Sequence, residues 1–218
     1  MTQGLNQIDD KLKAQLGIRC SDRKRRPRMR DFPPFIPVEN LWETQPYSYT
    51  DSNGMTQTGE MGSTMVVVLL PRAAEVKAGT PPGGDQLQPI TDFLTTRYPQ
   101  YNFIKGHMWN QEVGGKGETY NLVPLTSKAN SAHKNYAETP LKEALISFDS
   151  YYANNPQISK AYGFEYRVEI QDMNHGVWPG VAEPIVPNAI YVQASPIEYN
   201  ARTKKHDKKN SIIEEAVP

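Results

Sequence analysis

The segment from Phe103 to Glu138 combines residue types that can support acid–base and metal chemistry. It reads FIKGHMWNQEVGGKGETYNLVPLTSKANSAHKNYAE and holds two histidines, four glycines and several asparagines between short apolar runs. Its polar residues have defined gaps. Asn121 lies fourteen residues after His107, Asn130 nine residues further on, and Glu138 eight residues beyond Asn130.

These gaps suggest a chemistry if residues 128–138 form a helix. Asn130, Lys134 and Glu138 are then four residues apart and drift by only about 80° around the axis. Amide and carboxylate oxygens on one helical face suit a Mg²⁺ ion that keeps most of its waters. The imidazole of His107, on a strand, can deprotonate a water molecule, and the metal can neutralise charge on a phosphodiester.

Simpler interpretations of the same residues stay open. A lone histidine at the end of an apolar strand, such as His107, is more often a structural hydrogen-bonding group than a catalyst. The glycine loop GGKG at residues 114–117 lacks the GxxxxGK[ST] spacing of a phosphate-binding loop and does not open a helix. A tight turn that needs positive φ is therefore the favoured interpretation of that loop.

The elements that must position these residues indicate an α+β protein with a mixed or antiparallel sheet and irregular, proline-rich connections. Helical spacing predicts helices over residues 5–16, 89–99, 128–138 and 139–156. Thr91 is the expected N-cap of the second helix, and Thr139-Pro140 the expected N-cap and first residue of the last. Expected strands or extended segments cover residues 61–70, 101–110, 121–126, 162–173 and 188–200, the last of these closing the fold.

The charge distribution divides the chain into three parts. Residues 1–31 form a basic N-terminal arm with a balance of +5, and residues 201–210 carry +4, in a tail expected over 201–218. The body between them, residues 32–200, carries −7. The run Arg19–Arg30 is interpreted as a solvated segment, a nucleic-acid contact or a docking tag for a partner. A proline-rich connector, residues 31–40, follows it.

Composition also sets expectations about the compartment. The single cysteine, Cys20, excludes an internal disulfide and fits a reducing cytosol. The longest apolar run, residues 65–70, is too short to span a bilayer, and residues 1–17 hold no apolar signal-peptide core. We expect synthesis in a bacterial cytoplasm without a signal peptide, no membrane partner, and injection or secretion by a separate apparatus if the protein acts on a target cell.

The motif residues resemble the ββα-metal (His-Me finger) fold, and within it the DNA/RNA non-specific endonuclease family. Gly106-His107 matches the end of that family's DRGH tetrapeptide, and Asn121-Leu122-Val123-Pro124 matches the end of its loop. The gaps to Asn130 and Glu138 are those of the family. The resemblance covers about residues 100–145. This segment is also similar to nuclease domains of bacterial toxins and injected effectors.

The resemblance implies a role for each matching residue. His107 would be the general base, Asn121 would orient the loop beneath it, and Asn130 would bind Mg²⁺ or Mn²⁺. Glu138 would hold a metal-bound water. His133 and Lys134 lie on the same helix and are candidate phosphate contacts, although His133 could equally cap a neighbour.

The tetrapeptide departs from the family pattern at two positions. Ile104 and Lys105 replace its Asp and Arg, so a positive charge remains without the two-pronged guanidinium. Lys105 stays a candidate catalytic residue. Either another residue, such as Lys134 or Arg167, stabilises the transition state, or activity is weak.

Three functions compete. The first is a Mg²⁺-dependent endonuclease that acts on DNA, RNA or both as a bacterial toxin or effector, with a delivery apparatus and an immunity protein as candidate partners. The second is a degenerate nuclease fold that serves as a binding or structural cargo module, and the third is a nucleic-acid binder that uses the basic arms.

Overall fold

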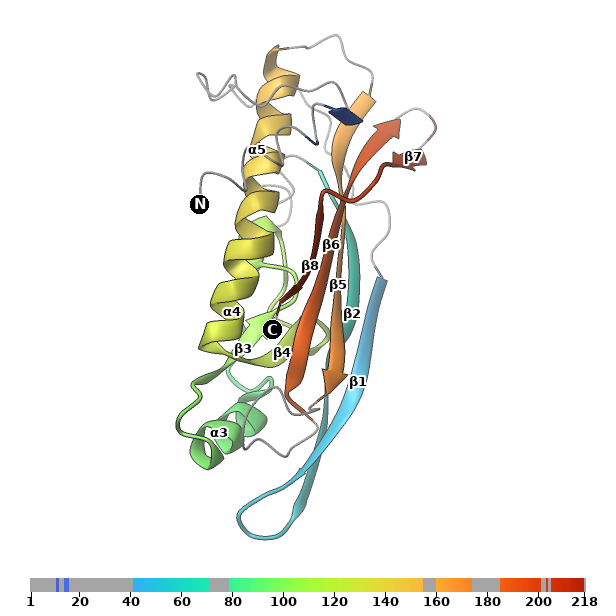
Figure 1. Ribbon diagram of the computed structural model, residues 1–218. Coiled ribbons are helices and arrows are strands. Elements are labelled where there is room, and N and C mark those ends of the chain that lie inside the picture. The colour runs from blue at the N-terminus through green and yellow to red at the C-terminus, as the bar shows by residue number, and fades with distance from the viewer. Residues whose placement is uncertain are drawn as a thin grey trace.

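The computed structural model describes residues 11, 14–15, 41–70, 79–154, 160–173, 185–200, 203 and 205–217. Its main feature is a long, six-stranded antiparallel sheet (Figure 1). The strands run in the order β1-β2-β5-β6-β7, and β8 also pairs with β6. Their bounds are β1 (Leu41–Thr50), β2 (Thr56–Leu69), β5 (Lys160–Met173), β6 (Pro187–Asn200), β7 (Lys205–Lys208) and β8 (Ile213–Val217).

A second, two-stranded sheet and a long helical run carry the motif residues. The hairpin pairs β3 (Phe103–His107) with β4 (Leu122–Thr126), so that His107 lies opposite Leu122. The helical run follows at once, in the order ββα, and α3 precedes the hairpin. The helical bounds are α3 (Gln88–Arg97), η1 (Gln111–Val113), η2 (Thr119–Asn121), α4 (Ser127–His133), η3 (Lys134–Glu138) and α5 (Thr139–Asn154).

The core lies between α5 and one face of the large sheet, as Figure 1 shows. Alternation along β2 sends Met65, Val67 and Leu69 to this face, and Phe164 and Tyr166 do the same on β5. The helical run contributes side chains at helical spacing, namely Ala137, Leu141, Ala144, Leu145 and Phe148. Burial of these apolar side chains fixes the helical run against the sheet.

The β3–β4 hairpin packs between two cores. Val123 and Leu125 of β4 belong to the core under α5, whereas Phe103 and Leu122 belong to a second core with α3. The hairpin therefore presents one face to α5 and the other to α3 and the segment before it.

The helical run from Ser127 to Asn154 is continuous, which corrects the predicted break at Thr139-Pro140. Thr139 has helical φ and ψ of −63° and −49°, and the N-cap is Thr126, whose Oγ1 accepts a hydrogen bond from the Ala129 N–H at 3.1 Å. Pro140 has no N–H to bond the carbonyl four residues earlier. The wide π-turn η3 ends at Glu138, two residues before Pro140, within the same helical run.

Other predictions have mixed outcomes. The α+β class with an antiparallel sheet is confirmed, and strands occur at 56–69, 103–107, 122–126, 160–173 and 187–200. Thr91 is not an N-cap, because α3 begins at Gln88 and Leu87 holds the cap position with φ of 53°. Strand β1 was not predicted.

The end of the chain differs from expectation. β6 is not the last strand, because β7 and β8 follow it and pair with it. The predicted tail over 201–218 thus contributes two strands to the large sheet. The basic run Arg19–Arg30, the proline-rich connector, and most of the predicted helix 5–16 lie outside the described residues. No helix in the described ranges is long and apolar enough to cross a bilayer.

Candidate active site

Lys105 and His107 share one face of the β3–β4 hairpin, because residues two apart on a strand point to the same side. Both contact the segment Gly79–Gly84, which we call the strap. His107 Nε2 lies 3.0 Å from the Thr80 carbonyl oxygen. Lys105 Nζ donates to the carbonyl oxygens of Gly83 (2.7 Å) and Gly84 (3.2 Å).

The strap determines the tautomer of His107. A carbonyl oxygen only accepts hydrogen bonds, so Nε2 must carry the proton, and in the neutral ring the lone pair is on Nδ1. Burial lowers the pKa of His107 below its usual value, and the hydrogen bond to Thr80 acts in the opposite direction. The ring is therefore neutral at physiological pH and able to accept a proton at Nδ1.

Close backbone packing holds the strap in place against the glycine loop. Thr80 N donates to the Gly115 carbonyl (3.0 Å), and Gly117 N donates to Thr80 Oγ1 (2.8 Å). A Cβ on Gly115 would overlap the Trp109 carbonyl, and one on Gly117 would overlap the Pro81 carbonyl. The loop GGKG thus serves close packing, and only Gly114 among its glycines has positive φ, at 104°.

Asn121 fixes the chain where it leaves His107. This asparagine is fully buried, and its Oδ1 accepts from Trp109 N at 2.8 Å. Its Nδ2 donates to the carbonyl oxygens of Trp109 (2.9 Å) and Lys116 (2.8 Å), and its own carbonyl accepts from Met108 N (2.9 Å). The side chain therefore binds both sides of the loop between β3 and β4, directly after His107.

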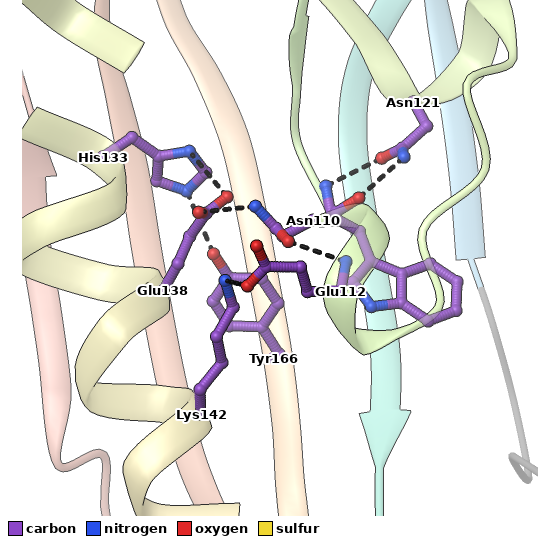
Figure 2. A network of polar contacts seen from close by, with 8 residues as sticks. Asn110, Glu112, Asn121, His133, Glu138, Lys142 and Tyr166 are labelled. Carbon is purple, nitrogen blue, oxygen red and sulfur yellow. Dashed lines mark hydrogen bonds and ion pairs between the residues drawn. The ribbon is translucent and has the colours of Figure 1, made fainter. Parts of the chain in front are cut away.

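Glu138 connects the helical run to the same loop, as Figure 2 shows. Its carboxylate is buried, and its Oε2 accepts from Asn110 Nδ2 at 2.7 Å. Burial raises the pKa of Glu138 to about 7, while the charge of Lys142 and the hydrogen bond from Asn110 act to lower it. Lys142 and Asn110 do not fully offset the burial of this carboxylate, so further positive charge beside it would lower its pKa.

His133 lies behind Glu138, away from solvent. It is completely buried, its Nε2 lies 3.0 Å from the Tyr166 hydroxyl, and its Nδ1 lies 3.7 Å from Glu138 Oε1 (Figure 2). Burial and the charge of Lys142 lower the pKa of His133 to about 4, so the ring is neutral. Because the ring is buried, a phosphate cannot reach it. Its contacts match the alternative prediction, in which His133 binds a neighbouring side chain.

An ion pair between Lys142 and Glu112 lies next to this network. Lys142 Nζ lies 2.6 Å from Glu112 Oε2, between α5 and the turn η1 (Figure 2). Glu112 is exposed, so screening keeps the pair's contribution to stability small. Its effect on the site is local, because Lys142 places a positive charge beside Glu138 and His133.

Asn130 and Lys134 lie one helical turn apart on the helical run. Asn130 is partly exposed, and no hydrogen bond within the described residues engages its side-chain amide. Lys134 is exposed, so it can meet a phosphate.

Asn130 and Glu138 carry the kind of oxygen donor that a hydrated divalent cation prefers. Asn130 offers one free hard oxygen and Glu138 an undercompensated carboxylate. Within the described ranges, no group of three or more His, Cys, Asp or Glu side chains is placed to hold a metal.

Arg167 does not belong to this site. Tyr166 on β5 faces His133 and the helices, and neighbouring strand residues point to opposite faces. Arg167 therefore faces the other side of the sheet, where it pairs with Glu169. The suggestion that it stabilises a transition state is wrong.

Sequence reasoning missed three participants of the site, namely Thr80, Asn110 and Tyr166. Thr80 contributes a backbone carbonyl, for which side-chain identity gives no signal. Tyr166 was visible only as an apolar position in a strand. Asn110 could have been found, since it follows His107 by three residues and asparagine is a common cap at the start of a turn.

Comparison with known proteins gives little further information. No protein-family profile matches the chain, and no curated protein sequence matches it. Among solved structures, the chain is similar to the Sda1 nuclease with bound zinc ion, with 11% identity and a TM-score of 0.34. That match covers 83% of this chain and 92% of the other chain. A similarity of this size carries no argument about fold, activity or metal.

Proposed function

We propose that the protein is a divalent-metal-dependent endonuclease that hydrolyses phosphodiester bonds of DNA, RNA or both. The observation that carries the proposal is the state of His107. Its Nε2 donates to the Thr80 carbonyl, so the lone pair of the neutral ring lies on Nδ1, which can act as a base at the end of β3. The ββα order and the spacing to Asn121, Asn130 and Glu138 support the proposal, because they resemble the pattern of the His-Me endonucleases.

His107 acts on the attacking water. Nδ1 takes the proton, and the positive charge that develops on the ring is stabilised through Nε2–H by the Thr80 carbonyl. Asn121 keeps the loop after His107 in place, so that the ring does not reorganise during the reaction. This arrangement needs no side-chain carboxylate beside the histidine.

Asn130 and Glu138 would hold the cation, Asn130 directly and Glu138 through a bound water. When bound, Mg²⁺ or Mn²⁺ supplies positive charge to the phosphate and the leaving oxygen. Lys134, exposed on the same helical run, is the residue proposed to contact a neighbouring phosphate. Lys105 would add a second positive charge on the face of His107.

Cleavage assays test the proposal directly. Plasmid DNA and a structured RNA are incubated with the protein in Mg²⁺, in Mn²⁺ and in EDTA. We expect cleavage that requires the metal and falls by about 10² to 10⁴ in His107→Ala, the usual cost of losing a general base. Metal-independent cleavage, or full activity of a folded His107→Ala variant, would refute the mechanism.

A second candidate function is a degenerate fold that binds partners without chemistry. The ammonium of Lys105, which stands at the family's arginine position, donates to two backbone carbonyls of the strap. In this candidate function the ammonium serves only to hold the strap. Binding of nucleic acid or of a protein partner without any cleavage in either metal would favour this candidate.

The toxin part of the proposal rests on the resemblance to toxin nuclease domains. Its test is expression inside a bacterial cell. Growth arrest with degraded nucleic acid, relieved by His107→Ala and by a co-expressed neighbouring gene, would support a toxin with an immunity partner. Normal growth during expression of active enzyme would argue against a toxin.

A further inference from the structure

Asn110 forms the direct link between the two halves of the candidate site. It follows His107 by three residues, in the turn that leaves β3. Its side-chain amide makes two hydrogen bonds of opposite polarity. Oδ1 accepts from Glu112 N at 2.8 Å, and Nδ2 donates to Glu138 Oε2 at 2.7 Å.

The orientation of this amide follows from its partners. The Glu112 backbone N–H can only donate, so it must meet the amide oxygen. With Oδ1 bonded to that N–H, the amide nitrogen is left to donate to Glu138 Oε2. One side chain thus caps the turn η1 and binds the helical run at the same time.

Asn110 itself is held firmly. The preceding residue, Trp109, is bound by the buried Asn121 through both its N–H and its carbonyl. The Asn110 carbonyl accepts from Val113 N at 3.1 Å and from Gly115 N at 3.0 Å. The amide therefore projects toward Glu138 from a backbone that is fixed on both sides.

Glu138 depends on this contact for its orientation. Among the described residues, Asn110 is the only hydrogen-bond donor to its carboxylate, since His133 Nδ1 lies 3.7 Å away, too far for a hydrogen bond. Oε1 is left without a hydrogen bond from the protein in the described part of the chain. Oε1 lies toward the buried His133, so Oε2 is the oxygen whose position Asn110 fixes.

We propose that Asn110 is a positioning residue that fixes the Glu138 carboxylate for a divalent cation and sets its distance from the His107 strand. The inference rests on the proposed metal-dependent function and adds to it a residue outside the family pattern quoted for this chain. Hydrogen bonds to residues around a metal typically change metal affinity or activity by about 10–100-fold.

Two substitutions separate the cap from the link to Glu138. Asn110→Ser keeps an oxygen that can cap η1 and loses the donor to Glu138, because serine is a good N-cap. Asn110→Ala loses both. Asn102→Ala is the matched control, since Asn102 lies just before the other end of β3 and donates to Ser127 on the surface.

The experiment measures Mn²⁺ binding to the full chain by electron paramagnetic resonance, together with kcat and KM for plasmid cleavage. We expect Asn110→Ser and Asn110→Ala to weaken Mn²⁺ binding alike, by about 10-fold or more, and to lower kcat with little change in KM. Asn102→Ala should bind as the wild type does. Thermal unfolding confirms that each variant is folded, and Asn110→Thr replaces a serine variant that is not.

Each possible outcome either supports or overturns the proposed role of Asn110. Wild-type Mn²⁺ affinity in Asn110→Ser, with loss only in Asn110→Ala, would show that the cap alone matters and would overturn the proposal. A wild-type protein that binds no Mn²⁺ would overturn it as well. Asn110-dependent Mn²⁺ binding in a protein that cleaves nothing would support the positioning role and refute the nuclease function.

Discussion

At the scale of single residues, His107 gives the protein a defined pH dependence. Burial lowers its pKa below the usual 6.5, and a base must be unprotonated to act. We expect kcat/KM in saturating Mg²⁺ to be level at neutral pH and to fall as pH drops through the lowered pKa, with a midpoint below 6.5. A pH–rate profile measures this. An acid limb centred above pH 6.5 would contradict the assignment of His107 as the base.

Glu138 and His133 make the stability of the protein depend on pH in opposite directions. Its folded pKa is raised from 4.5 to about 7, so its contribution to stability is fully present below pH 4.5 and is lost as pH rises through 7. The pKa of His133 is lowered from 6.5 to about 4, so its contribution is present above pH 6.5 and is lost as pH falls toward 4. The two effects oppose each other in the wild type.

Glu138→Gln separates these effects. Glutamine can accept the hydrogen bond from Asn110 without placing a charge in the buried site. We expect the difference in Tm between Glu138→Gln and wild type, measured in EDTA, to grow in favour of the variant from pH 4.5 to pH 8. If the Tm of the variant and of the wild type changed in parallel with pH, burial would not disfavour the charged form of Glu138.

At the scale of elements, the continuous helical run predicts different costs for two threonines. Thr126 caps the run, and losing its hydrogen bond to Ala129 N should cost about 1 kcal/mol. Thr139 lies in the helix interior, where alanine is the better helix former. We expect Thr126→Ala to lower the free energy of unfolding and Thr139→Ala to leave it level or slightly higher. Equal losses would indicate a break at Thr139.

The strap and the glycine loop give a second prediction at this scale. Gly117→Ala would drive a methyl group into the Pro81 carbonyl, whereas a Cβ on Gly84 would meet nothing within 4 Å. We expect Gly117→Ala to destabilise the protein by about 1–3 kcal/mol and to lower kcat, because the Thr80 carbonyl moves away from His107. Gly84→Ala is the control, and denaturant unfolding with cleavage assays compares the two.

The elements that sequence reasoning found are those with a strong local pattern. The β-branched run in β2 and the alternation in β5 predicted strands because one face of each is buried. Strand β1 was missed because LWETQPYSYT mixes polar residues with a proline, and its pairing with β2 depends on register rather than on propensity. The helix break at Thr139-Pro140 was wrong because packing of Leu141 and Ala144 on the sheet outweighs the local cap signal.

The candidate site shows the same division. The spacing of Asn121, Asn130 and Glu138 was readable because it lies within one contiguous hairpin and helix. The contacts of Thr80 and Tyr166 join segments that are 27 and 33 residues from their partners His107 and His133. No local pattern specifies such contacts, so they required the structure.

At the scale of the whole molecule, the two basic ends of the sequence are not equivalent. Residues 205–217 include β7 and β8, which pair with β6. Lys208 pairs with Glu165 of β5, and Lys209 pairs with Asp207. Their charges are thus balanced locally. Removal of residues 201–218 would also remove two strands, so truncation cannot report on charge alone.

Charge neutralisation offers a cleaner comparison. Each phosphate contact made by Lys or Arg lowers log K by about 0.9 per unit of log salt on duplex DNA. Because Lys208 and Lys209 already have acidic partners, we expect Lys208→Gln with Lys209→Gln to leave the salt dependence of DNA binding almost unchanged. Replacement of the seven basic residues in Arg19–Arg30 by glutamine should weaken DNA binding and flatten the slope. The reason is that residues 32–200 carry −7 and repel DNA on their own. Fluorescence anisotropy at several salt concentrations measures both slopes. An unchanged slope in the N-terminal variant would assign that run to a partner or a delivery apparatus instead of to nucleic acid.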